Sequence, residues 1–135
     1  MKQTLSPDSR QELILYRLNR ASETLEEAAY IARGNYYNAA VNRLYYACYY
    51  ASSALMLSNH VESSTHAGIK TMLGLKFIKP GLIPMKYGRI YQQLFENRQS
   101  GDYEDFVYCD KEMYGELEPL AIDFVSYMKD YILKE

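Results

Sequence analysis

The chain has 135 residues, of which 48% are hydrophobic and 24% charged, and a formal net charge of −2. These are ordinary values for a globular protein, and the length suits one domain, residues 1–135, with a core of its own. The weakly acidic balance excludes a protein that binds nucleic acid by neutralising phosphates over its whole surface, so any such contact must be local. The sequence starts without the apolar stretch of a signal peptide and has no apolar run of about 18 residues, so we expect a cytoplasmic protein with no membrane partner.

Two cysteines and two histidines are the scarce reactive residues of the chain. Cys48 and Cys109 lack CxxC spacing, so neither a zinc site nor a secreted disulfide framework is predicted, and both thiols are expected to be reduced. His60 and His66 have no Cys, Asp or Glu at the spacing of metal ligands. We therefore expect capping or packing roles for both histidines, and no metal or cofactor.

Two helices are predicted in the first half of the chain. The first begins at Ser6-Pro7, where a serine cap precedes a proline at the first helical position, and it ends at Gly34. The second covers about residues 35–58, carries Arg43 as its one charged residue, and contains six tyrosines. A surface helix would carry more charge, so this helix is predicted to lie in the core, at a subunit interface, or in both.

Three more helices are predicted in the second half. A third follows the capping hydroxyls of Ser63-Ser64-Thr65 and runs through Phe77, and a fourth runs over residues 84–98. Irregular backbone is expected over about residues 101–109, before a last helix at about 110–133. No sustained period-two alternation indicates a strand. The sequence therefore predicts an all-α, up-and-down bundle of four to five helices.

The segment after the fourth helix places a guanidinium, a carboxylate and a phenol close together in sequence, at Arg98, Asp102 and Tyr103. On an unbroken helix Arg98 and Tyr103 would point to different faces, but Gly101 can take a left-handed cap conformation that lets the chain fold back. Arg98 would then hold a phosphate bidentately, with Tyr103 as a donor, acceptor or modification site. The residues alone favour the alternative that Arg98 caps helix carbonyls and pairs with Asp102.

Arg43 is the other candidate ligand for an anion. On a largely covered helix its charge must reach solvent, a carboxylate or a bound anion. An ion pair with Glu26 or Glu27 of the first helix is the favoured interpretation, and a functional role follows only if Arg43 faces the same pocket as Arg98. The GxSxG, Walker, HExxH and Rossmann glycine patterns are absent from the sequence, so the well-marked enzyme classes have no support.

Three short patterns occur in a distinctive order. They are Tyr37-(x)2-Ala40-(x)2-Arg43-(x)-Tyr45-Tyr46-Ala47, Ser64-Thr65-His66 and Arg98-(x)3-Asp102-Tyr103. Together they resemble the HEPN domain superfamily, in particular its small single-domain prokaryotic members, and the resemblance covers nearly the whole chain. It implies a homodimeric all-α bundle that is often encoded beside a small nucleotidyltransferase, with which it forms a toxin and antitoxin pair.

The resemblance also implies roles for individual residues. Many members are metal-independent ribonucleases in which an arginine is followed four to six residues later by a histidine; Arg98 matches the arginine, but residues 103–105 are Tyr, Glu and Asp. A phenol with a pKa of about 10 is a poor substitute for imidazole near neutral pH, so Tyr103 would need a large pKa shift to act beside Arg98 in catalysis. In some paired members a tyrosine near the arginine accepts nucleotidyl groups, and Tyr103 is the residue nominated for that role.

Three functions are compatible with these patterns. The first is a homodimeric module that binds nucleotide or RNA phosphate through Arg98, Asp102, Tyr103 and Arg43 and acts with a nucleotidyltransferase-type partner. The second is a structural or adaptor bundle whose tyrosine-rich helix forms a protein interface. The third is a metal-independent endoribonuclease with Arg98 and Tyr103 as catalytic residues. We rank them in that order, and we expect no DNA partner.

Overall fold

The protein is a bundle of helices, seen in a computed structural model that describes residues 5–103 and 109–134, with the side chains of residues 99–103 left aside. Its elements are α1 (Pro7–Arg33), α2 (Tyr37–Ser58), α3 (His66–Leu73), a short π-helical segment η1 (Gly74–Ile78), α4 (Met85–Tyr103) and α5 (Lys111–Leu133). Within those described ranges there is no strand, so the predicted all-α class is confirmed. None of the described helices is long and apolar enough to cross a membrane.

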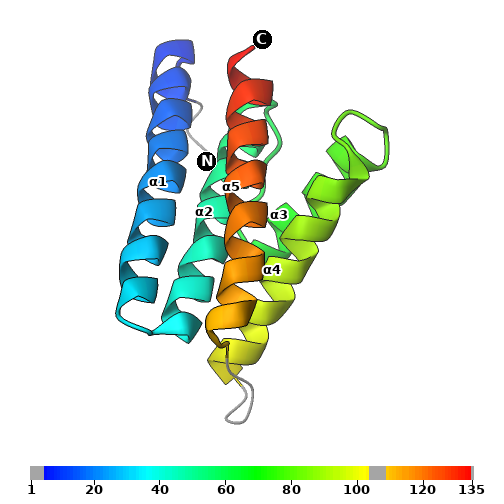
Figure 1. Cartoon of the computed structure of the whole chain (residues 1–135). Helices are drawn as coiled ribbons and strands as arrows, with labels where there is room; N and C mark the ends of the chain where they lie inside the picture. The colour runs from blue at the N-terminus through cyan, green and yellow to red at the C-terminus, as the bar shows by residue number, and fades with distance from the viewer. Residues whose placement is uncertain (1–4, 104–108, 135) are drawn as a thin grey trace.

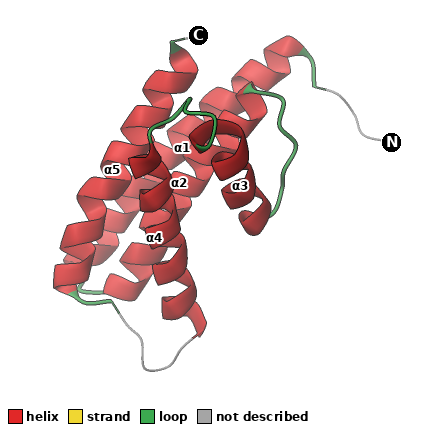
Figure 2. Cartoon of the chain, turned by 90° about the vertical axis from the view of Figure 1, so that its right-hand side faces the viewer, coloured by secondary structure: helices red, strands yellow, loops and turns green. Residues whose placement is uncertain are grey.

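Helix α2 occupies the middle of the bundle. It contacts α1, α3, α4 and α5, and the most extensive helix-to-helix contacts among the described elements are those it makes with α1, α5 and α4. In Figure 1, α1, α2 and α5 lie side by side, and α4 is tilted away from them. Figure 2, which is turned by 90°, shows α3 in front of α2. The predicted core position of the tyrosine-rich helix is confirmed, because one side of it is buried along its whole length.

Side-chain caps fix three of the helix starts. The Ser6 hydroxyl accepts a hydrogen bond from the Ser9 N–H at 3.1 Å, directly before Pro7 begins α1. Thr65 does the same for the Gly68 N–H at 2.9 Å, and this cap fixes the first residue of α3 as His66. The carboxylate of Asp110 caps α5 in the same way. These contacts satisfy backbone donors that a helix start leaves without partners.

The end of the fourth helix differs from the sequence-based prediction. Irregular backbone was expected from Gly101, but α4 continues through Gly101 to Tyr103. Glycine permits the left-handed cap conformation without requiring it, and inside a helix it costs only about 1 kcal/mol relative to alanine. The predicted break at Gly101 was therefore wrong, and positions 98 and 103 lie on different faces of one helix, whereas residues 104–108 of the predicted irregular segment lie outside the described residues.

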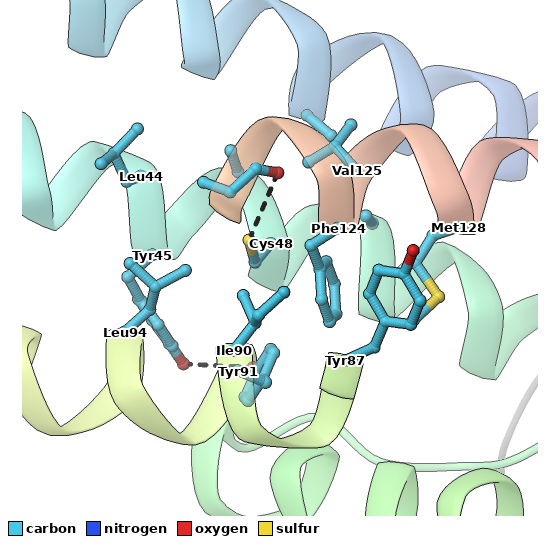
Figure 3. Close-up of a cluster of buried hydrophobic side chains, with 14 of the residues drawn as sticks. Leu44, Tyr45, Cys48, Tyr87, Ile90, Tyr91, Leu94, Phe124, Val125 and Met128 are labelled. Atoms are coloured by element: carbon cyan, nitrogen blue, oxygen red, sulfur yellow. Dashed lines mark hydrogen bonds between the residues drawn. The ribbon is translucent and has the colours of Figure 1, made fainter. Parts of the chain in front are cut away.

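The core is aromatic where α2 meets α4 and α5. Tyr45 is 0% exposed, and its ring centroid lies 5.7 Å from that of Tyr91 on α4. The Tyr91 ring is in turn 5.7 Å from Phe124 on α5, so one aromatic chain crosses three helices (Figure 3). Cys48 lies in the same layer as a free thiol, and burial raises its pKa well above the usual value.

Replacing Phe124 tests how far the bundle depends on this aromatic layer. Because Phe124 is fully buried, Phe124→Ala is expected to lower the free energy of unfolding by about 3 to 5 kcal/mol through lost burial and the cavity left behind. Urea unfolding followed by circular dichroism measures the change. The control is Ile122→Ala on the same helix, where the side chain is 48% exposed and a far smaller change is expected. Equal losses in the two variants would contradict this account of the core.

Candidate functional site

Arg98 lies on α4 with its guanidinium stacked on aromatic rings. Its Cζ atom is 5.0 Å from the centroid of the Tyr45 ring and 5.7 Å from that of Phe95. The side chain is half-buried, whereas Tyr45 beneath it is fully buried. Stacking on fixed aromatic faces favours the cation and restricts its motion, which leaves a guanidinium fork in a defined position near the surface.

His66, the first residue of α3, lies against the same tyrosine. Its Nδ1 atom is 2.7 Å from the Tyr45 hydroxyl oxygen, and its ring stacks on Tyr49 with a centroid separation of 4.3 Å. The ring also meets Tyr46 edge to face at 5.5 Å. This agrees with the packing role expected for His66, but no local sequence pattern predicts that the imidazole lies beside the Tyr45 ring on which Arg98 stacks.

Burial and charge keep this imidazole neutral. Desolvation lowers the pKa of His66, and the positive charge of Arg98 lowers it further. The phenols around it also stay neutral, because burial raises the pKa of Tyr45 to about 12 and raises that of Tyr91 strongly. Near pH 7 the Arg98 cluster, which we define as Arg98, Tyr45, His66 and Tyr91, therefore combines the Arg98 cation with three neutral side chains that can donate or accept hydrogen bonds.

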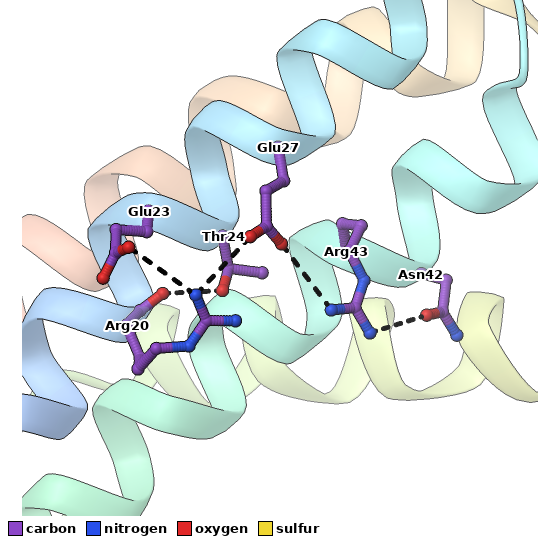
Figure 4. Close-up of polar contacts among 6 residues, drawn as sticks. All are labelled: Arg20, Glu23, Thr24, Glu27, Asn42 and Arg43. Carbon is purple, nitrogen blue, oxygen red and sulfur yellow. Dashed lines mark hydrogen bonds and ion pairs between the residues drawn. The ribbon is translucent and has the colours of Figure 1, made fainter.

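Arg43 lies in a different ion-pair network. Its Nη1 atom is 3.8 Å from a carboxylate oxygen of Glu27, which also pairs with Arg20 at 3.4 Å (Figure 4). The Arg43 guanidinium stacks on Tyr46, 4.6 Å from the ring centroid. The predicted ion pair between Arg43 and Glu27 is thus confirmed, and it joins α2 to α1. The ring of Tyr46, which packs on Tyr45 at 5.2 Å, is what connects this network to the Arg98 cluster.

The other two residues of the predicted site belong to the end of α4. The backbones of Asp102 and Tyr103 are helical, whereas their side chains lie outside what the structure describes. Helical spacing places position 102 on the same face as Arg98, four residues earlier, and position 103 on another face. The roles of Asp102 and Tyr103 therefore stay predictions.

A separate pocket of about 390 Å³ lies where the start of α1 meets the end of α2. Arg10 donates a hydrogen bond to the Leu57 carbonyl at 3.1 Å, and Arg17 to the Ser53 carbonyl at 3.4 Å. These arginines bond to carbonyl oxygens of the last turns of α2, as basic side chains commonly do at a helix end. Their contacts explain a structural role, so the Arg98 cluster remains the stronger candidate for a functional site.

The Arg98 cluster suits an anion rather than a metal ion. Arginine forms short, charge-assisted hydrogen bonds to phosphate oxygens, and a neutral imidazole can add a further N–H donor. Among the described residues there is no group of three His, Cys, Asp or Glu side chains able to hold a metal. Sequence reasoning missed His66 and Tyr45 as partners of Arg98. The available signal was that all three belong to the patterns Tyr45-Tyr46, Ser64-Thr65-His66 and Arg98-(x)3-Asp102-Tyr103.

Comparison with known proteins finds several relatives. The HEPN domain family matches residues 14–131. The UPF0332 protein of Thermotoga maritima is 33% identical over 105 residues, which are 78% of this chain and 80% of the relative. A Methanocaldococcus jannaschii protein named "Putative toxin MJ0605" is 36% identical over 103 residues, 76% of each chain. A second protein of that organism, "Putative toxin MJ0142", is 25% identical over 118 residues, covering 87% of this chain and 80% of the relative.

The family match begins at Ile14 in α1 and ends at Tyr131 in α5. It therefore includes α2, α3 and α4, which carry Tyr45, His66 and Arg98. A match over most of the chain, in agreement with the all-α fold, shows that this chain belongs to the HEPN domain family.

Proposed function

We propose that the protein is a homodimeric module that binds the phosphate of a nucleotide or RNA and acts with a nucleotidyltransferase-type partner, as in a toxin and antitoxin pair. The observation that carries the proposal is the half-buried Arg98 guanidinium stacked on Tyr45 beside the neutral His66. Membership of the HEPN family and the similarity to two proteins named as toxins support the same function.

The phosphate site is built around Arg98. Its stacking fixes the guanidinium, and a fixed fork loses less conformational entropy when it binds a phosphate bidentately. We assign Asp102, four residues after Arg98 on the helix, the role of orienting the fork or the ligand, and Tyr103 the role of accepting a nucleotidyl group from the partner enzyme. Arg43 is assigned no contact with the ligand, because it lies in a different network in which its charge is paired with Glu27.

An adaptor bundle is the second candidate, and one observation favours it. Helix α1 exposes large apolar or aromatic side chains at Leu15, Tyr16 and Tyr30, the residue types that protein interfaces collect. This face serves equally for the proposed dimer or for the partner protein. An active endoribonuclease ranks third, since Tyr103 and Arg98 occupy different faces of α4.

Removal of the Arg98 charge tests the phosphate site. Arg98→Gln is expected to weaken binding of a short single-stranded RNA at least tenfold, because a bidentate charged contact is lost. The matched control is Arg89→Gln, which removes the same charge from an exposed position of α4. Fluorescence anisotropy at fixed ionic strength measures both, and circular dichroism checks that each variant is folded. Equal binding by the two variants would remove Arg98 from the site.

Modification of Tyr103 tests the proposed partnership. When the protein is incubated with a nucleotidyltransferase of the kind proposed as its partner, with ATP and Mg²⁺, its mass is expected to rise by one or more nucleotidyl groups. A phenol can accept such a group, and a nearby arginine can hold the added phosphate. Intact-protein mass spectrometry detects the product, and Tyr108→Phe serves as the control for Tyr103→Phe. Modification that persists in Tyr103→Phe would exclude this residue as the acceptor.

A further inference from the structure

A chain of three polar side chains runs from α3 into the core. The Nδ1 atom of His66 is 2.7 Å from the hydroxyl oxygen of Tyr45, which is 3.4 Å from the hydroxyl oxygen of Tyr91. Each phenol has one hydrogen to donate. The chain can be polarised outward, from Tyr91 through Tyr45 to Nδ1, or inward, from an Nδ1–H through Tyr45 to Tyr91. If both neighbours donated to the Tyr45 oxygen instead, the O–H of the fully buried Tyr45 would have no acceptor, so that arrangement is disfavoured.

Burial of Tyr91 selects the outward direction. Tyr91 is 1% exposed, and within the described part of the chain its hydroxyl has no hydrogen-bond partner other than Tyr45. In the inward arrangement the Tyr91 O–H would be buried without an acceptor, which is costly, whereas in the outward arrangement it donates to Tyr45. The Tyr45 O–H then donates to His66, so Nδ1 is an acceptor.

The direction of the chain fixes the tautomer of His66. A neutral imidazole that accepts a hydrogen bond at Nδ1 carries its hydrogen on Nε2, on the other side of the ring. The stack on Tyr49 and the edge contact with Tyr46 hold the ring in this orientation. Among the described residues Nε2 has no hydrogen-bond partner, so its N–H remains available to a ligand.

We propose that His66 is a second phosphate ligand of the Arg98 site, and that its neutral imidazole donates the Nε2–H to a non-bridging oxygen of an RNA phosphodiester. This inference rests on the proposed function, because it assigns another ligand to the same site. Arg98 supplies the charge and His66 supplies a directed neutral donor. Both groups contact the ring of Tyr45, so one buried side chain positions the two ligands.

The charges around His66 predict how RNA affinity depends on pH. The titratable or charged groups beside the ring are Tyr45, Tyr46 and Tyr49 from α2 and Arg98 from α4. Two further cations lie one contact away: Arg17 of α1 interacts with Tyr49, and Lys70 of α3 lies over Phe95. No carboxylate is among these described groups, and a bound phosphodiester would add a negative charge beside the ring. It favours the imidazolium and raises the pKa of His66 in the complex above its lowered value in the free protein.

The sign of the effect follows from linkage. Affinity is constant above the pKa of the bound form, rises as pH falls between the bound and free values, and levels off below the free value. A phosphodiester does not titrate in this range, and arginine stays charged. RNA affinity is therefore expected to rise roughly three- to tenfold between pH 7.5 and pH 5.5.

The experiment compares two substitutions of His66 with one of His60, the other histidine of the chain. The probe is a short oligouridylate with hydroxyl groups at both ends, so that only phosphodiesters carry charge.

His66→Gln can place an amide N–H near the position of Nε2 without titrating, so near-normal affinity at pH 7.5 and no rise at lower pH are expected. His66→Asn can replace the Nδ1 acceptor but not the Nε2 donor, so affinity should fall roughly three- to tenfold at every pH. His60→Asn, which suits the positive φ of 58° at that position, should behave as the wild type.

The outcomes separate this inference from the function on which it rests. If Arg98→Gln weakens binding but the pH dependence survives in His66→Gln, or disappears in His60→Asn, the role of His66 is overturned and the phosphate site stands. If Arg98→Gln binds as the wild type does, the proposed function and the inference both fail. Unchanged affinity at pH 7.5 in a folded His66→Asn variant would also overturn the donor role.

Nitrogen-15 NMR of the imidazole gives a readout that does not depend on RNA. The Nε2–H tautomer and a pKa below the ordinary value for histidine are expected for His66 in the free protein, followed by a rise in that pKa when the oligouridylate is added. A predominant Nδ1–H tautomer, or a pKa that does not change on RNA binding, would overturn the inference.

Discussion

The fully buried ring of Tyr45 is the contact on which the arrangement of this bundle depends. It packs on Tyr91 and Phe95 of α4, and its hydroxyl bonds to His66 of α3, so one side chain of α2 fixes two other helices. A phenylalanine would fill nearly the same volume but leave the hydroxyl of Tyr91 without its partner. The polar tip is therefore as important as the ring, because a buried hydroxyl is stable only when it is hydrogen-bonded.

The tyrosine-rich composition of α2 has a common physical explanation. Arginines of neighbouring helices stack on its tyrosine rings. The Cζ atom of Arg20 on α1 lies 5.3 Å from the centroid of the Tyr50 ring, and that of Arg98 on α4 lies 5.0 Å from the centroid of the Tyr45 ring. Phenol rings bury a large area while offering a face to a cation and a hydroxyl to a hydrogen bond. Helix α2 has one charged residue of its own, but its tyrosine rings bind arginines of α1 and α4.

Much of the fold could be predicted from the sequence because its signals are local. Ser6 and Asp110 cap helices that begin at the expected residues, and the pairing of Arg43 with Glu27 follows from the need to neutralise the one charge of α2. Gly101 misled the prediction because glycine allows a helix to end without requiring it, and contacts elsewhere on α4 do not appear in the local pattern.

The candidate site was only half predictable. Arg98 stood out as a guanidinium near a helix end, but Tyr45 and His66 belong to other helices, α2 and α3, and are themselves 21 residues apart. A single histidine on a helix start is ordinarily a packing residue, and His66 does pack on Tyr49. Only the three-dimensional arrangement shows that the same imidazole feels the charge of Arg98 and bonds to a buried phenol.

The two arginine networks beside α2 differ in what surrounds them, and this difference separates structure from function. Glu27 pairs with both Arg20 and Arg43, so the attraction among these three residues is used to join α1 to α2. Arg98 stacks on the rings of Tyr45 and Phe95, and its charge acts on His66 by disfavouring a second cation. An anion bound beside both groups would offset that repulsion. The aromatic contacts hold the Arg98 guanidinium near His66, whereas the charge of Arg43 is used in the pair with Glu27 that joins α2 to α1.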